Sequence, residues 1–114
     1  KEALALINGV SVTAALAAFA VVRSRRLLDA AVAACAMTLE AVGADAGCID
    51  PRPLALRGHP GATVIGAALR TWLEGSTCVT MGRLPDAFSI RCAPQVLGAA
   101  LGQSIMSRSW WSGS

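Results

Sequence analysis

The pattern of apolar and polar positions predicts helices in the first part of the chain. An almost wholly apolar stretch over residues 10–24 predicts a helix that either Asn8 or Ser11 can cap. A second helix is predicted over residues 26–42, and Gly43 is a natural terminator for it. Its apolar positions alternate four and three residues apart: Leu28, Val32, Cys35, Leu39 and Val42. This heptad spacing indicates that the second helix lies along a near-parallel or antiparallel partner.

Prolines and glycines divide the rest of the chain. Residues 44–60 are rich in both and predict a loop, and residues 61–74 predict a third helix that stops at Gly75. Residues 77–90 are predicted to be irregular, and a last helix runs from about Pro94 to Ser107. We therefore expect an all-α chain without a sheet, in which residues 1–107 form the helical part and residues 108–114 an irregular tail. The tail contains two adjacent tryptophans and is interpreted as a foreign or frayed end outside any helix.

The composition is unusually poor in charge. Apolar residues make up 54% of the chain and charged residues 15%, against about 25% charged in an ordinary globular domain. Such a chain either lies in a membrane or is covered by other protein. The uncharged stretch from Ala3 to Val22 is long enough to span a bilayer, and arginines follow it. Its many alanines and the Asn8-Gly9 pair weaken that interpretation, so a helix buried inside a larger protein is favoured over a membrane span.

Charge and cysteine usage exclude two further classes of function. The net charge is +3, but the basic residues form no stripe and no aromatic residues alternate with them, which argues against nucleic-acid binding. The four cysteines form no C-x-x-C pair and His59 is the only histidine, so no metal site is predicted. We expect four reduced thiols, mostly buried, in a cytoplasmic protein.

Three segments resemble those of a known family when they are taken together and in order. Residues 1–9 read KEALALING, similar to K-E-G-L-A-L-x-N-G. Residues 49–61 read IDPRPLALRGHPG, similar to D-P-R followed by a spacer and R-P-H-x-G-Q. Residues 86–98 read DAFSIRCAPQVLG, similar to Q-D-x-Y-S-L-R-C-x-P-Q-V-x-G after its first glutamine. The family is that of the aromatic amino acid ammonia-lyases, which act on histidine, phenylalanine or tyrosine, and the resemblance covers residues 1–103.

The resemblance implies a fold and a chemistry. The fold would be a central fragment of an L-aspartase/fumarase-like helical bundle, within a homotetramer whose active sites form where several subunits meet. The reaction would eliminate ammonia from an aromatic amino acid to give an α,β-unsaturated acid. The family's electrophilic cofactor, methylidene-imidazolone (MIO), forms from an Ala-Ser-Gly tripeptide that this chain lacks. The family's base tyrosine and an acidic residue near the amine also fall outside the matched segments, so the chain alone is expected to be inactive.

The resemblance implies roles for individual residues. Asn8 matches the asparagine that hydrogen-bonds near the electrophile, although by itself it would be a helix cap. Arg91 matches the arginine that holds the substrate carboxylate, whereas a lone arginine is usually a solvated surface residue. His59 is expected to have a structural role. Phe88 stands where the family has a catalytic-site tyrosine and therefore lacks the hydroxyl, and Pro85 replaces a glutamine.

These departures leave alternatives open. The parent protein is either a divergent lyase or aminomutase, or a non-catalytic relative that keeps the helical scaffold. A small single-span membrane protein is the third possibility, from a different class.

Overall fold

A computed structural model describes residues 1–80 and 86–112, with side chains as far as Gln103 in the last helix. The elements are α1 (Glu2–Asn8), α2 (Ser11–Ala41), the 3-10 helix η1 (Ala46–Ile49), α3 (Pro51–Leu56), α4 (Pro60–Trp72), α5 (Phe88–Arg91) and α6 (Ala93–Ser112). The described residues form no strand, and a single parallel bridge joins Asp45 to Thr80. The prediction of an all-α fold is confirmed.

The two helices predicted in the first part of the chain are in fact one. Helix α2 runs unbroken from Ser11 to Ala41, because the arginine-rich junction contains good helix formers and no glycine or proline. The predicted cap was also wrong, since Val10 stands at the N-cap of α2 and makes no side-chain cap bond. Asn8 instead ends the short helix α1. Gly9 follows it in an extended conformation, where a β-carbon would lie only 2.6 Å from the carbonyl oxygen of Ala5.

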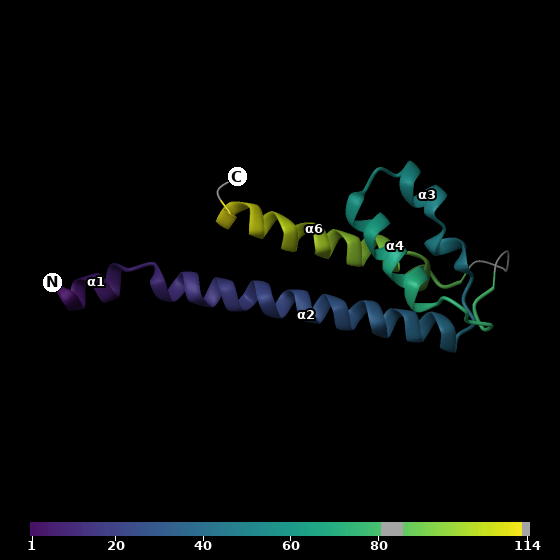
Figure 1. The fold of residues 1–114 in the computed structure, drawn as a ribbon, viewed down its shortest axis with the longest axis horizontal. Coiled ribbons are helices and arrows are strands. Elements are labelled where there is room, and N and C mark those ends of the chain that lie inside the picture. Colours follow the sequence, from purple (N-terminus) through teal and green to yellow (C-terminus); the bar gives the residue numbers. More distant parts are fainter. Residues whose placement is uncertain (81–85, 113–114) are drawn as a thin grey trace.

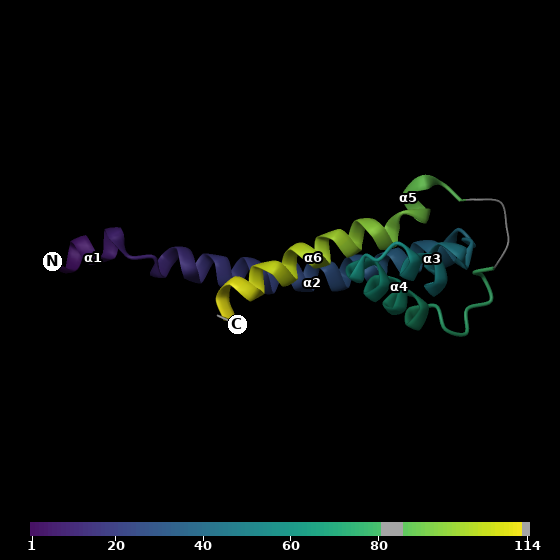
Figure 2. The same ribbon diagram turned by 90° about the horizontal axis from the view of Figure 1, so that it is seen from above.

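The heptad spacing on α2 marks the face that packs. Leu28, Val32 and Leu39 are buried and Cys35 is half-buried, whereas Val42 lies beyond the end of the helix and is 51% exposed. Helix α6 runs back along α2 in the opposite direction (Figures 1 and 2). The predicted antiparallel partner is therefore α6.

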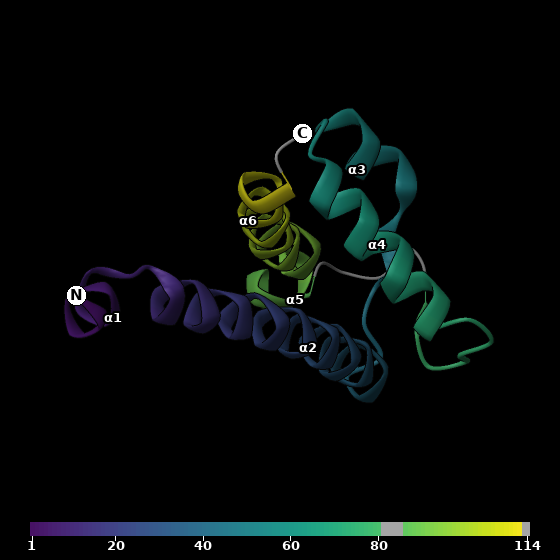
Figure 3. The ribbon, with the colours of Figure 1, turned by 60° about the vertical axis from the view of Figure 1, so that its left-hand side comes forward.

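The core lies where α2, α4 and α6 meet. Figure 3 shows α4 and α6 side by side above α2. The buried residues that contact one another there are Val32, Ala36, Leu39, Ala44, Ile49, Ile65 and Leu69. Glycines allow α4 and α6 to approach closely, because a β-carbon on Gly61 would lie 2.2 Å from the carbonyl oxygen of Gly98. This close packing fixes the start of α6 against α4.

The segment predicted as a loop, residues 44–60, contains two short helices, so that prediction was wrong in detail. Each helix begins with an aspartate whose side chain accepts a hydrogen bond from a backbone N–H group in the first turn. Asp45 caps η1 in this way, and Asp50 caps α3, where Pro51 occupies the first helical position. The prolines therefore start a helix here and do not prevent one.

The structure confirms some of the remaining predicted helix boundaries and corrects others. Helix α4 agrees with the predicted third helix, and Gly75 follows it with a positive φ of 81°. The stretch expected to be irregular contains α5, and α6 begins one residue before Pro94. Helix α6 continues to Ser112, so the expectation of an irregular tail from residue 108 was wrong for residues 108–112. Residues 103–112 contain no glycine or proline that would end the helix. Pro85 and residues 113–114 lie outside the described residues.

Helix α1 and the first half of α2 form an apolar arm that no other part of the described chain covers. Among the exposed large apolar side chains are those of Leu4, Leu6, Ile7, Val12, Leu16 and Phe19, each at least 64% exposed. By length and composition, residues 2–41 contain a stretch that could cross a membrane, and none of that stretch is buried within the chain. This apolar arm requires a cover that the single chain does not provide.

Candidate functional site

A cleft of about 380 Å³ opens between α5, the start of α6, and the η1–α3 segment. These elements come from two parts of the chain that are far apart in sequence. The residues that line the cleft are Asp45, Gly47, Cys48, Pro53, Leu54, Arg57, Phe88, Arg91, Cys92 and Gln95. Two of the three site residues expected from the resemblance, Phe88 and Arg91, therefore share one cleft.

Arg91 ends helix α5 and is exposed at the cleft. Its guanidinium carbon Cζ lies 6.0 Å from the centre of the Phe88 ring, a cation–π distance. The one ion pair among the described residues joins Arg52 to Asp50, so no carboxylate within that part of the chain neutralises Arg91. Asp45 also lines the cleft, and its Oδ1 accepts a hydrogen bond of 2.8 Å from the N–H of Gly47.

Other groups that line the cleft were not predicted from the sequence. Arg57 adds a second guanidinium, and the Oε1 atom of Gln95 is buried without a hydrogen-bond partner among the described residues. The thiols of Cys48 and Cys92 complete the wall. Burial is the main cause that raises the pKa of Cys48 above its ordinary value of 9.0, so this thiol stays protonated at neutral pH. Gln95 and Cys92 fall within the third resembling segment, which was the signal available for them.

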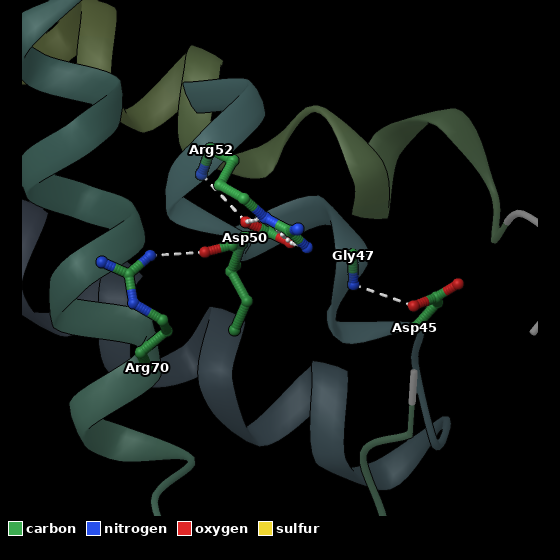
Figure 4. A network of polar contacts seen from close by, with 6 residues as sticks. Asp45, Gly47, Asp50, Arg52 and Arg70 are labelled. Atoms are coloured by element: carbon green, nitrogen blue, oxygen red, sulfur yellow. Dashed lines mark hydrogen bonds and ion pairs between the residues drawn. The ribbon is translucent and has the colours of Figure 1, made fainter. Parts of the chain in front are cut away.

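A polar network holds the η1–α3 wall of the cleft in place (Figure 4). The carboxylate of Asp50 accepts hydrogen bonds from the backbone and side chain of Arg52, with a shortest contact of 2.7 Å. These bonds, the side-chain bond first, lower the pKa of Asp50 from 3.8 to about 2. From the neighbouring helix α4, the guanidinium of Arg70 donates to the carbonyl oxygen of Ile49 at the end of η1.

His59 has the structural role that was expected of it. Its Nδ1 accepts a hydrogen bond of 3.2 Å from the N–H of Ala62 and so caps the start of α4. His59 does not line the cleft.

Asn8 lies far from the cleft. Helix α1, which ends at Asn8, and helix α5, which carries Phe88 and Arg91, lie toward opposite ends of the long axis (Figure 2), along which the chain extends 68 Å. The side chain of Asn8 is exposed and makes no hydrogen bond within the part of the chain that the structure describes. One copy of this chain therefore does not bring the three expected site residues together.

Comparison with known proteins agrees with the resembling segments. The family model described as aromatic amino acid lyase matches residues 1–110. The histidine ammonia-lyase of Gloeobacter violaceus is 44% identical over 105 residues, which cover 89% of this chain and 20% of that protein. That of Rhodospirillum rubrum is 41% identical over 109 residues, 90% of this chain and 21% of that protein.

The match is extensive for this chain but covers a small part of its relatives. The histidine ammonia-lyase of Clostridium tetani is 41% identical over 103 residues, 88% of this chain and 20% of that protein. The chain thus spans about a fifth of the length of these curated relatives. No solved structure matches the chain. The family match extends over nearly all of the sequence, and the chain belongs to the aromatic amino acid lyase family.

Proposed function

We propose that this chain is a segment of an enzyme that eliminates ammonia from an aromatic amino acid and releases an α,β-unsaturated acid. Histidine is the substrate that we favour, because the relatives named above are histidine ammonia-lyases. Those relatives are about five times as long, so the proposal concerns a longer subunit to which the chain contributes.

The observation that carries the proposal is the guanidinium of Arg91 on the cleft, which makes no ion pair with any residue that the structure describes. A guanidinium can hold a carboxylate through two parallel N–H···O bonds, which fixes both the position and the orientation of an amino acid substrate. The adjoining Phe88 ring offers an apolar face to an aromatic side chain. Arg57 adds positive charge to the same cleft, which favours an anionic ligand further.

Asn8 would act in a site that it shares with another copy of the chain. Because Asn8 and Arg91 lie toward opposite ends of one copy, a site that uses both must take them from different subunits. The exposed amide of Asn8 fits a group that donates a hydrogen bond to an electrophile without ionising. The electrophile, MIO in this family, would supply an electron-accepting group that makes loss of ammonia possible. Its Ala-Ser-Gly precursor does not occur in this chain and would come from another part of the subunit.

Assembly into a homo-oligomer, a tetramer by the family resemblance, would also cover the apolar arm. Leu4, Ile7, Leu16 and Phe19 are exposed on α1 and the first half of α2, where copies of the same helices can pack on them. Burial in an assembly is preferred over a membrane span, because Asn8, Gly9, Ser11 and Thr13 interrupt the apolar stretch with polar or small groups. The four free thiols suit the reducing cytoplasm.

Phe88 favours a second candidate, a relative that keeps the scaffold without catalysis. The family position holds a tyrosine, and the Phe88 ring brings no hydroxyl donor to the cleft. An inactive relative would retain the helical packing and the assembly but would release no product. Activity of the full-length protein decides between the two candidates.

The test is steady-state kinetics of the full-length protein with histidine, phenylalanine and tyrosine, followed by ultraviolet absorbance of the unsaturated acid. The variant Arg91→Ala should lower kcat/KM by roughly ten- to a hundredfold, since a bidentate charge-assisted contact is lost. Arg25→Ala, on the exposed face of α2, is the matched control and should leave kcat/KM unchanged. Unchanged kinetics in Arg91→Ala would contradict the carboxylate role. Failure to release any product in the wild type would favour the scaffold candidate.

A further inference from the structure

Asp86 joins the two walls of the cleft. Its Oδ2 atom accepts a hydrogen bond of 2.6 Å from the backbone N–H of Asp45, a residue 41 positions away in the chain. Asp86 stands two residues before α5, which carries Phe88 and Arg91, and Asp45 is the N-cap of η1 on the opposite wall. The half-buried carboxylate is thus a direct link between the segment that holds Arg91 and the segment that faces it.

The η1 side of this link is fixed independently of Asp86. The N–H of Ala46 donates to the carbonyl oxygen of Thr80 at 2.7 Å, and the N–H of Thr80 donates to the carbonyl oxygen of Ala44 at 3.2 Å. Ala44 is fully buried in the core. The N–H group of Asp45 is therefore presented from a rigid position, against which a carboxylate can anchor a less constrained segment.

On the α5 side, few other contacts hold the segment that carries Arg91 in place. Helix α5 has only four residues and none of them is buried, although Ile90 packs partly against the core. Phe88 and Arg91 are exposed, and the N–H groups of Ile90 and Arg91 donate only to the nearby carbonyl oxygen of Ala87. Within the described residues, the bond from Asp45 to Asp86 is the one hydrogen bond between the Asp86–Arg91 segment and the opposite wall.

We propose that Asp86 is a positioning residue for Arg91: it holds α5 against η1 so that the guanidinium faces the cleft and binds the substrate carboxylate. The proposal rests on the carboxylate role assigned to Arg91 above. Asp86 does not itself line the cleft, and its Oδ2 atom accepts the hydrogen bond from the Asp45 N–H group. Its effect on substrate must pass through the placement of Arg91.

The test is a double-mutant cycle in the full-length lyase, with Asp86→Ala, Arg91→Ala and the combined variant, assayed with histidine. Asp86→Ala should raise KM by roughly tenfold and change kcat less than about twofold. The reason is that a loosened carboxylate contact weakens the binding of the substrate and of the transition state to the same extent. In the Arg91→Ala background the same change should add little, since the residue to be positioned is gone. Asp86→Asn keeps an acceptor oxygen and should restore most of the wild-type KM.

Asp29→Ala, on an exposed position of α2, is the control and should match the wild type. Suppose that Asp86→Ala folds and has a normal KM, whereas Arg91→Ala raises KM as predicted. That result would overturn the positioning role of Asp86 and leave the carboxylate role of Arg91 standing. An Asp86→Ala effect that is as large without Arg91 as with it would also overturn it, because Asp86 would then act on the fold. If Asp86→Ala does not fold, the KM of Asp86→Asn is the test. A KM of Asp86→Asn that is raised as far as the KM of Arg91→Ala would overturn the proposal. Wild-type kinetics in Arg91→Ala would overturn the proposed carboxylate site and this inference together.

Discussion

Gly61 of α4 and Gly98 of α6 face each other with no room for a side chain on either. A β-carbon on Gly98 would lie 2.4 Å from the amide nitrogen of Ala62 and 2.6 Å from the carbonyl carbon of Gly61. Because these atoms belong to the backbone, they cannot turn aside as a flexible side chain could. The two glycines therefore set the distance between α4 and α6, and with it the position of the cleft at the start of α6.

Gly98→Ala should lower the free energy of unfolding by about 1–3 kcal/mol, the usual cost of forcing extra volume into a packed interface. Gly102→Ala, one turn further along α6, is the matched control, since nothing lies within 4 Å of a β-carbon there. It should be neutral or stabilise the helix by up to about 1 kcal/mol. Urea unfolding of both variants measures the difference, and equal effects would contradict the close packing.

The ion pair between Asp50 and Arg52 predicts a pH dependence of stability. The pKa of Asp50 is about 2 in the folded chain against an ordinary 3.8, so the folded state binds the proton more weakly than the unfolded state. The stabilisation is therefore complete above pH 3.8 and is lost as the pH falls toward 2. The difference in unfolding free energy between wild type and Asp50→Ala should shrink over this range. A difference that stays constant with pH would contradict the charged hydrogen bond.

The thiol of Cys48 should be slow to alkylate. Burial raises the pKa of Cys48 and of Cys35 above 9.0, and only the thiolate reacts. Cys78 is exposed and serves as the internal comparison within the same chain. With iodoacetamide at pH 8, peptide mass spectrometry should find Cys78 modified first and Cys48 protected, and urea should abolish the difference. Equal rates in the folded chain would contradict the burial of Cys48.

The predictable parts of the fold are those with a local signal in the sequence. The heptad spacing on Leu28, Val32 and Leu39 identified the buried face of α2, and Gly43 marked the point where the chain leaves it, with a positive φ of 60°. The short helices η1 and α3 were missed because prolines and glycines suggest a loop. Their starts depend on the capping aspartates Asp45 and Asp50, whose effect is seen only when the backbone N–H groups are in place.

The candidate site was predictable only in part. The motif around Arg91 and Phe88 gave those two positions, and they do line one cleft. Tertiary packing brings the facing wall there. Arg57 falls within the second resembling segment, whereas Cys48 carries no local signal. Asn8 was expected at the same site, and its place in an assembly of copies stays a prediction.

The most direct measurement is complementation between two impaired variants of the full-length protein, Asn8→Ala and Arg91→Ala, produced separately and together and assayed with substrate below KM. If each active site takes Asn8 from one copy and Arg91 from another, mixed oligomers contain some sites with both wild-type residues, about a quarter in random mixing. Coexpression should therefore restore roughly that share of the wild-type kcat/KM, whereas Arg91→Ala alone should keep only about 1–10% of it. Activity in the coexpressed sample no higher than in the separate variants would contradict a site shared between copies of this chain.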